Sequence, residues 1–78
     1  MTLNNLNVGE VANVVFIDEN SNLYQRFIDI GIIKGTKIEC VLKSPFNDPK
    51  AYLIRGAIIA IRNCDAEKII VTKEVRKC

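Results

Sequence analysis

The chain has no histidine and no tryptophan among its 78 residues. Without histidine, the serine and cysteine triads that catalyse acyl transfer lose their usual general base. A bound iron or zinc ion would have to rely on carboxylates and thiolates alone. These two absences argue against an enzyme and against a resident metal centre.

The acidic residues and glycines also lack the spacing of a reactive site. Asp18 and Glu19 are neighbours, Asp65 and Glu67 lie close to Cys64, and the remaining acids are isolated. Most of these acids fall in expected turns, caps or termini, whereas a general acid and base must be buried and must converge. The four glycines are too far apart for a phosphate-binding loop. We therefore expect no catalytic residues, no metal ligands and no cofactor.

Long apolar runs and paired cysteines are missing as well. The longest apolar runs, at residues 57–61 and 14–17, are far shorter than the ~20 residues of a membrane-spanning helix. The first ten residues have neither the basic nor the apolar region of a secretory signal. The three cysteines, Cys40, Cys64 and Cys78, have no C-x-x-C spacing, which argues against disulfides and a zinc knuckle. We expect a reduced, cytoplasmic protein without direct membrane insertion.

Charge does not indicate a nucleic-acid partner. The net charge of +2 comes from 11 basic and 9 acidic residues that are spread along the chain. Small barrels bind single strands through aromatic platforms with basic flanks, and the best such cluster is Tyr52 with Lys50 and Arg55. However, Phe16 and Phe27 are expected in the core, and few other aromatic residues remain. We favour a strand with a snorkelling charged edge and expect no nucleic acid.

The residues that are abundant favour strands. The hydrophobic content is 49%, with many isoleucines and valines, which suits one β-rich domain over residues 1–78. Residues 11–18 carry apolar side chains on both faces, so both faces should be covered. Residues 36–43 alternate strictly, with Ile38, Cys40 and Leu42 on the expected core face.

One short helix is expected after the first strand. It should begin near Leu23, with Ser21 or Asn22 as its N-cap; if the cap is Asn22, Gln25 occupies the capping-box position. Gly31 is placed to end the helix in the left-handed conformation, in a Schellman motif that brings the next residue, Ile32, onto Phe27. A helix of two turns is too short to be stable alone, so it must pack on the sheet.

The second half of the chain completes the fold. Residues 44–49 form a loop, and residues 51–62 form two short strands or one bent strand that pivots at Gly56. Residues 63–68 make a turn or a helical stub, and residues 69–75 form the closing strand. The predicted class is mainly β, a small five-stranded SH3-like barrel with one short α-helix inserted after the first strand. An OB-like barrel is the nearest alternative.

The remaining chemistry is that of a protein contact. The loop places Phe46 between two prolines, and rigid aromatic side chains are typical interface anchors; alternatively, Phe46 folds back over the barrel end. Arg26 on the helix is expected to pair with Asp29 three residues later. The candidate partner-binding residues are Pro45, Phe46, Asn47, Asp48, Pro49, Tyr24 and Arg26.

Four segments together resemble a known family. They are "LNNLNVGEVANV" at 3–14, "RFIDIGIIKGTKIE" at 26–39, "SPFNDP" at 44–49 and "RGAIIAIRNCDAEKIIV" at 55–71. Their order and spacing resemble FeoA, the small cytoplasmic accessory protein of bacterial ferrous iron uptake. Lys34 and Asn47 depart from the family pattern and affect turn rigidity only. The resemblance implies an SH3-like barrel that acts as a non-enzymatic partner of FeoB, the membrane GTPase that moves Fe(II). Arg26 could then act on that GTPase as an arginine finger, although the pair with Asp29 is the favoured interpretation.

Two other functional classes remain as alternatives. One is the SH3-like C-terminal domain of iron-dependent repressors, although the chain has no helix-turn-helix segment. The other is a small nucleic-acid-binding barrel, whose affinity should fall steeply with salt. Exposed apolar strand faces in so small a barrel also suggest a homodimer or a swapped terminal strand.

Overall fold

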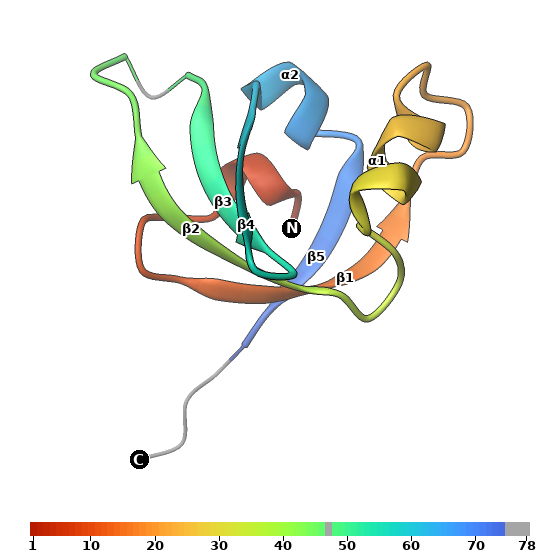
Figure 1. Cartoon of the computed structure of the whole chain (residues 1–78), viewed down its shortest axis with the longest axis horizontal. Coiled ribbons are helices and arrows are strands. Elements are labelled where there is room, and N and C mark those ends of the chain that lie inside the picture. The colour runs from red at the N-terminus through yellow and green to blue at the C-terminus, as the bar shows by residue number, and fades with distance from the viewer. Residues whose placement is uncertain (47, 75–78) are drawn as a thin grey trace.

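The computed structural model describes residues 1–46 and 48–74. This part of the chain forms one antiparallel sheet of five strands in the order β4-β3-β2-β1-β5. Figure 1 shows the sheet with α1 at one end and the first helical turn, η1, against it. The elements are η1 (Leu3–Asn5), β1 (Val11–Ile17), α1 (Tyr24–Ile30), β2 (Lys37–Lys43), β3 (Lys50–Ile54), β4 (Ala57–Ile61), α2 (Asn63–Ala66) and β5 (Ile69–Lys73).

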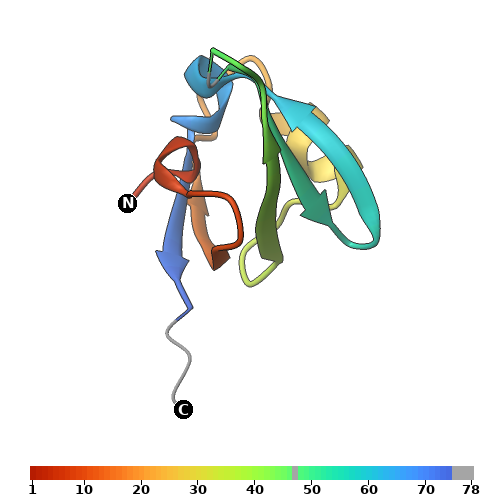
Figure 2. The same cartoon turned by 90° about the vertical axis from the view of Figure 1, so that its left-hand side faces the viewer.

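The sheet curls into a partly closed barrel around one core. In Figure 2 the β3–β4 hairpin and the β1–β5 pair stand on opposite sides of the curl, and β4 and β5 are the two edge strands. The predicted mainly β architecture, with one short helix after the first strand, is confirmed. Residues 63–68 contain the predicted helical stub, α2.

The predicted end of helix α1 is confirmed in detail. Gly31 has a left-handed backbone with φ of 103°. Its N–H donates to the carbonyl of Ile28 at 2.9 Å, and the N–H of Ile32 donates to the carbonyl of Phe27 at 2.9 Å. This is the Schellman pattern, and Ile32 and Phe27 are both buried in the core.

The start of α1 differs from the capping-box prediction. The helix begins at Tyr24, with Leu23 rather than Asn22 at the N-cap. Ser21 still contributes to the start of the helix, because its hydroxyl accepts the Leu23 N–H at 3.2 Å. Gln25 does not reach back to the cap, since its side chain donates to Asp29, one turn later, at 3.0 Å.

Residues 51–62 form two strands rather than one bent strand. A two-residue turn joins β3 to β4, with φ of 49° at Arg55 and 85° at Gly56. Positive φ at both central residues is the geometry of a type I′ turn, whose twist matches that of the paired strands. The turn therefore fixes the register, with Ile54 opposite Ala57.

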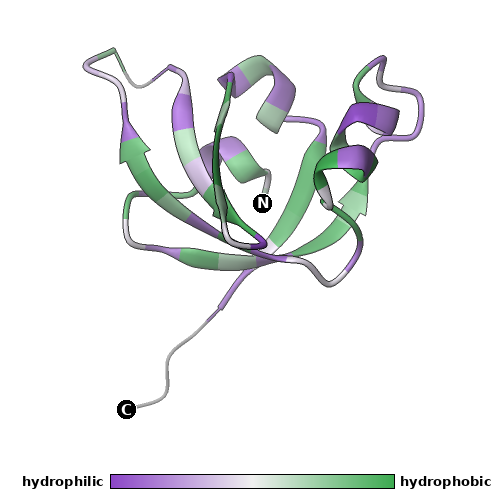
Figure 3. Cartoon of the chain, in the orientation of Figure 1, coloured by the Kyte–Doolittle hydropathy of each residue, from purple (hydrophilic) through white to green (hydrophobic). Residues whose placement is uncertain are grey.

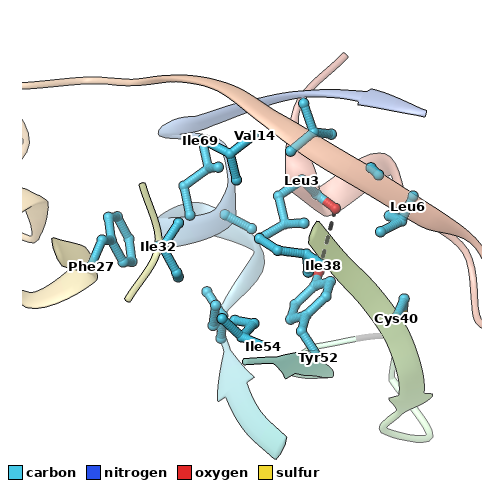
Figure 4. Close-up of a cluster of buried hydrophobic side chains, with 14 of the residues drawn as sticks. Leu3, Leu6, Val14, Phe27, Ile32, Ile38, Cys40, Tyr52, Ile54 and Ile69 are labelled. Carbon is cyan, nitrogen blue, oxygen red and sulfur yellow. Dashed lines mark hydrogen bonds between the residues drawn. The ribbon is translucent and has the colours of Figure 1, made fainter. Parts of the chain in front are cut away.

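The core lies in the hollow of the sheet, beneath η1. Figure 4 shows Leu3 and Leu6 pointing from the N-terminal segment toward Ile38 and Tyr52, and all four are fully buried. The phenol of Tyr52 donates to the carbonyl of Leu3 at 3.4 Å. The hydropathy colouring of Figure 3 shows hydrophobic residues concentrated along the strands.

Two core predictions were wrong, both at β-bulges. Phe16 is 54% exposed and Leu42 is 63% exposed. The β1–β5 register shifts between Val14 and Phe16, and the β2–β3 register shifts between Cys40 and Leu42. A bulge adds one residue to a strand and reverses the alternation beyond it. As a result, side chains that strict alternation assigns to the core point to solvent.

Candidate protein-interaction surface

The loop between β2 and β3 presents the predicted aromatic anchor. Phe46 is 88% exposed, so the alternative in which it folds back over the barrel end is wrong. Pro45 and Pro49 are also exposed, and Asn47 lies outside the described residues.

Hydrogen bonds fix the base of this loop. The Asp48 N–H donates to the Ser44 hydroxyl at 2.9 Å. The Asp48 carboxylate accepts the N–H of Asn63, the first residue of α2, at 3.0 Å. The loop thus displays Phe46 from a base that is tied to α2.

The other two predicted residues, Tyr24 and Arg26, lie on α1. In Figure 1 this helix lies at the opposite end of the molecule from the β2–β3 loop, so the seven predicted residues do not form one site. The described residues form two ion pairs, Lys73 with Glu10 and Lys37 with Glu74. The expected pair of Arg26 with Asp29 is therefore not formed there, and the arginine-finger hypothesis stays a prediction.

An apolar surface beside α1 was missed by the sequence analysis. We call it the bulge patch, and its residues are Val15, Phe16, Tyr24, Ile28 and Ile33. These side chains surround a shallow hollow of about 300 Å³ with Glu19 and Lys34 at its rim. The bulge in β1 creates the patch, because it leaves the consecutive residues Val15 and Phe16 both exposed. The available signal was the apolar character of both faces of residues 11–18.

A second hollow lies between α1 and the edge strand β4. We call it the helix groove. Its volume is about 450 Å³. The N-cap Leu23 and α1 contribute Leu23, Arg26, Phe27 and Ile30, and the other side contributes Ile59, Ala60, Ile61, Arg62 and Asp65. Its lining combines apolar side chains with two arginines and one aspartate. Arg26, one of the predicted residues, therefore faces a different surface from Tyr24.

The cluster considered for nucleic-acid binding does not form a platform. Tyr52 is fully buried, and burial raises its pKa. Lys50 is buried too, and its ammonium group donates to the carbonyls of Asn4 at 2.6 Å and Leu6 at 3.1 Å. A base cannot stack on a ring that is covered by the N-terminal segment.

Reactive chemistry is sparse among residues 1–46 and 48–74. In these ranges no group of three or more histidine, cysteine or acidic side chains is arranged to hold a metal ion. Burial raises the pKa of the Cys40 thiol. A hydrogen bond from Lys73 lowers the pKa of the Glu10 carboxylate. The helices described here are all too short or too polar to cross a bilayer.

Together, the curled five-stranded sheet, its inserted helix and its exposed apolar surfaces define a small SH3-like β domain. The model of the FeoA domain family matches residues 1–73. The chain therefore belongs to the FeoA family, as the sequence resemblance predicted.

Individual relatives agree with this assignment. A fusion of Fe(2+) transport protein A with the Fe(2+) transporter FeoB, from Porphyromonas gingivalis, is 31% identical over 71 residues. That match covers 91% of this chain but only 8% of the fusion protein. The NMR structure of a FeoA-like protein from Clostridium acetobutylicum has a TM-score of 0.91 at 28% identity, covering 100% of this chain and 91% of its own.

Two further structures bear on the fold. The zinc-complexed crystal structure of Stenotrophomonas maltophilia FeoA, described as a prokaryotic SH3 domain protein, has a TM-score of 0.82 at 25% identity, covering 92% of this chain and 89% of its own. The predicted SH3-like class is therefore confirmed. A manganese-dependent transcriptional repressor has a TM-score of 0.84 at 19% identity, over 94% of this chain and 40% of the repressor. This likeness shows that the two share a fold.

Proposed function

We propose that this chain is a cytoplasmic accessory protein of ferrous iron uptake that binds the membrane GTPase FeoB and performs no catalysis itself. The observation that carries the proposal is the P. gingivalis relative, in which FeoA and FeoB are one polypeptide. A covalent tether raises the effective concentration of two modules to the millimolar range. Where FeoA is not fused to FeoB, the surface of FeoA must supply the same association.

The exposed apolar surfaces support this role. Interface cores are enriched in aromatic side chains, and a few such anchors carry most of the binding energy. Phe16 in the bulge patch and Phe46 in the β2–β3 loop are both more than half exposed. We assign the larger contribution to the bulge patch, because its five apolar residues are contiguous, and a smaller one to the loop residues Pro45 to Pro49.

The test is a direct binding measurement with purified FeoB in detergent. Phe16→Ser should weaken binding by roughly tenfold or more, as expected for an aromatic anchor, and Phe46→Ala should weaken it less. Leu42→Ser is the matched control, because Leu42 is an exposed apolar strand residue outside both surfaces. Thermal unfolding of each variant shows whether the fold is kept.

The outcomes distinguish an error in the assigned surface from an error in the proposed function. A loss that is larger for Phe46→Ala than for Phe16→Ser would move the contact to the loop. Equal binding by all folded variants would reject both surfaces. Absence of binding by the unaltered chain would reject the proposed function.

A further inference from the structure

The edge strand β4 has an open side. It pairs with β3 through residues Ala57 to Ile61 and is the last strand of the sheet order. The two-residue turn makes Ile54 and Ala57 a hydrogen-bonded pair, so alternate residues, Ile58 and Ala60, direct their backbone N–H and C=O groups away from β3. Within residues 1–46 and 48–74, no backbone hydrogen bond outside the β3–β4 ladder reaches these two residues.

The side chains of β4 are unusual for an unprotected edge. Natural edge strands are normally blunted by charged residues, proline or a covering element. All five residues of β4 are alanine or isoleucine, and Ile58 is 64% exposed. Such an edge is a template for an added strand.

The helix groove lies along this edge. Phe27 and Ile30 of α1 face Ile59 and Ile61 across it. A strand added to β4 would therefore place alternate side chains over this mixed lining, while its backbone pairs with Ile58 and Ala60. The groove and the edge form one surface that is suited to an extended chain.

Charge indicates the chemistry of the occupant. Arg26 and Arg62 are exposed at the groove, where Asp65 is the one acidic lining residue. Arg55 adds a third cation at the turn end of β4, where its side chain lies against Gly31: a β-carbon added to Gly31 would lie 2.5 Å from the Arg55 Cδ. Three cations and one anion surround an apolar strand edge, a combination that is complementary to acidic and apolar residues.

The same charges disfavour a second copy of this chain. If two β4 strands paired in antiparallel fashion around Ile59, Arg62 of one copy would lie opposite Gly56 of the other, next to Arg55. Bringing these like charges near each other across an interface opposes association of two copies. An acidic strand from a different protein meets no such repulsion.

We propose that β4 and the helix groove bind an extended segment of another protein by strand addition, and that this segment combines acidic with β-branched residues. The backbone groups of Ile58 and Ala60 hold its main chain. Arg26, Arg55 and Arg62 select its acidic side chains. The inference holds for any partner with such a segment and does not depend on FeoB binding.

The probe is an acetylated and amidated seven-residue peptide with two glutamates at each end and three valines between them. It is titrated into the ¹⁵N-labelled protein at low salt, and amide shifts are followed by NMR. Shifts should concentrate at residues 57–62 and on α1. The Arg26→Glu and Arg62→Glu variants should each weaken binding by roughly 2- to 20-fold, since each reversal replaces an attraction with a repulsion of similar size.

Controls separate the contributions of charge and backbone. Lys43→Glu changes the net charge equally at an exposed residue outside the groove and the bulge patch and should leave binding unchanged. A peptide with lysine in place of glutamate should bind at least fivefold more weakly. A peptide whose alternate backbone nitrogens are methylated should lose binding, which tests strand addition without altering the protein.

Ala60→Pro removes the outward backbone N–H of residue 60 from the protein and should also abolish peptide binding. The NMR spectrum of this variant shows whether it folds. Three outcomes would overturn the proposal: no shifts at millimolar peptide, equal binding of the lysine peptide, or full binding of the methylated peptide. Concentration-dependent shifts at residues 57–62 without peptide would overturn it in favour of a homodimer.

Discussion

At the scale of single residues, burial gives the two described cysteines different chemistry. Cys40 on β2 is fully buried, and burial raises the pKa of its thiol. Cys64 on α2 is exposed. The thiolate is the reactive form of cysteine, so Cys40 lacks both access and ionisation.

We expect Cys64 to react with iodoacetamide under native reducing-agent-free conditions, while Cys40 reacts only through unfolding. If that unfolding costs ~5 kcal/mol or more, Cys40 should react about 10³-fold more slowly. The Cys78→Ser variant removes the third thiol, and peptide mass spectrometry over time gives the two rates. Similar modification rates for Cys40 and Cys64 without urea would mean that the core around β2 opens readily, which would contradict the prediction. In urea the chain is unfolded, and the two rates should become equal.

Single residues also show the limits of sequence reading. The burial of Phe27 follows from helical spacing, and the structure confirms it. The exposure of Phe16 does not follow from strand alternation, because alternation fails at the bulge. The sequence therefore identified Tyr24 as a candidate without showing that Phe16 lies on the same surface.

At the scale of elements, α1 is fixed at its C-terminal end by Gly31 and Arg55. Gly31 has φ of 103°, and the side chain of Arg55 occupies the space that a β-carbon would need. Gly35 has a similar φ of 91° but has no atom within 4 Å of that position. An alanine at Gly35 would therefore add backbone strain alone, whereas an alanine at Gly31 would add both strain and steric crowding.

Gly35→Ala should lower the free energy of unfolding by about 1–2 kcal/mol, the cost of a left-handed non-glycine residue. Gly31→Ala should cost more, because the Arg55 side chain must also move. Chemical denaturation measures both values. In the Arg55→Ala background, Gly31→Ala should cost no more free energy of unfolding than Gly35→Ala does. If Gly31→Ala still costs more there, the Arg55 side chain is not the cause of the difference.

At the scale of the whole molecule, Lys50 holds the N-terminal segment over the core. Its ammonium group bonds the carbonyls of Asn4 and Leu6, which are more than 40 positions away in sequence. Leu3 and Leu6 close the hollow of the sheet from the same segment. A buried lysine thus links β3 to η1.

Lys50→Met should lower the free energy of unfolding by about 1–3 kcal/mol, because two carbonyls lose their donor while the chain keeps its apolar volume. Lys43→Met, opposite Lys50 in the β2–β3 register and exposed, should change it by less than about 0.5 kcal/mol. Urea denaturation measures both. Hydrogen exchange should also accelerate in residues 3–8 of Lys50→Met; stability equal to that of Lys43→Met would contradict a linking role.

The sequence alone determined the short helix, its end at Gly31, the succession of five strands along the chain and the family resemblance. These features depend on signals within a few residues: capping, turn glycines and apolar spacing. Tertiary structure decided the bulges, the burial of Lys50 and Tyr52, and the meeting of α1 with the β4 edge. Register and burial depend on which strands pair and what covers them, and those partners lie far apart in the sequence.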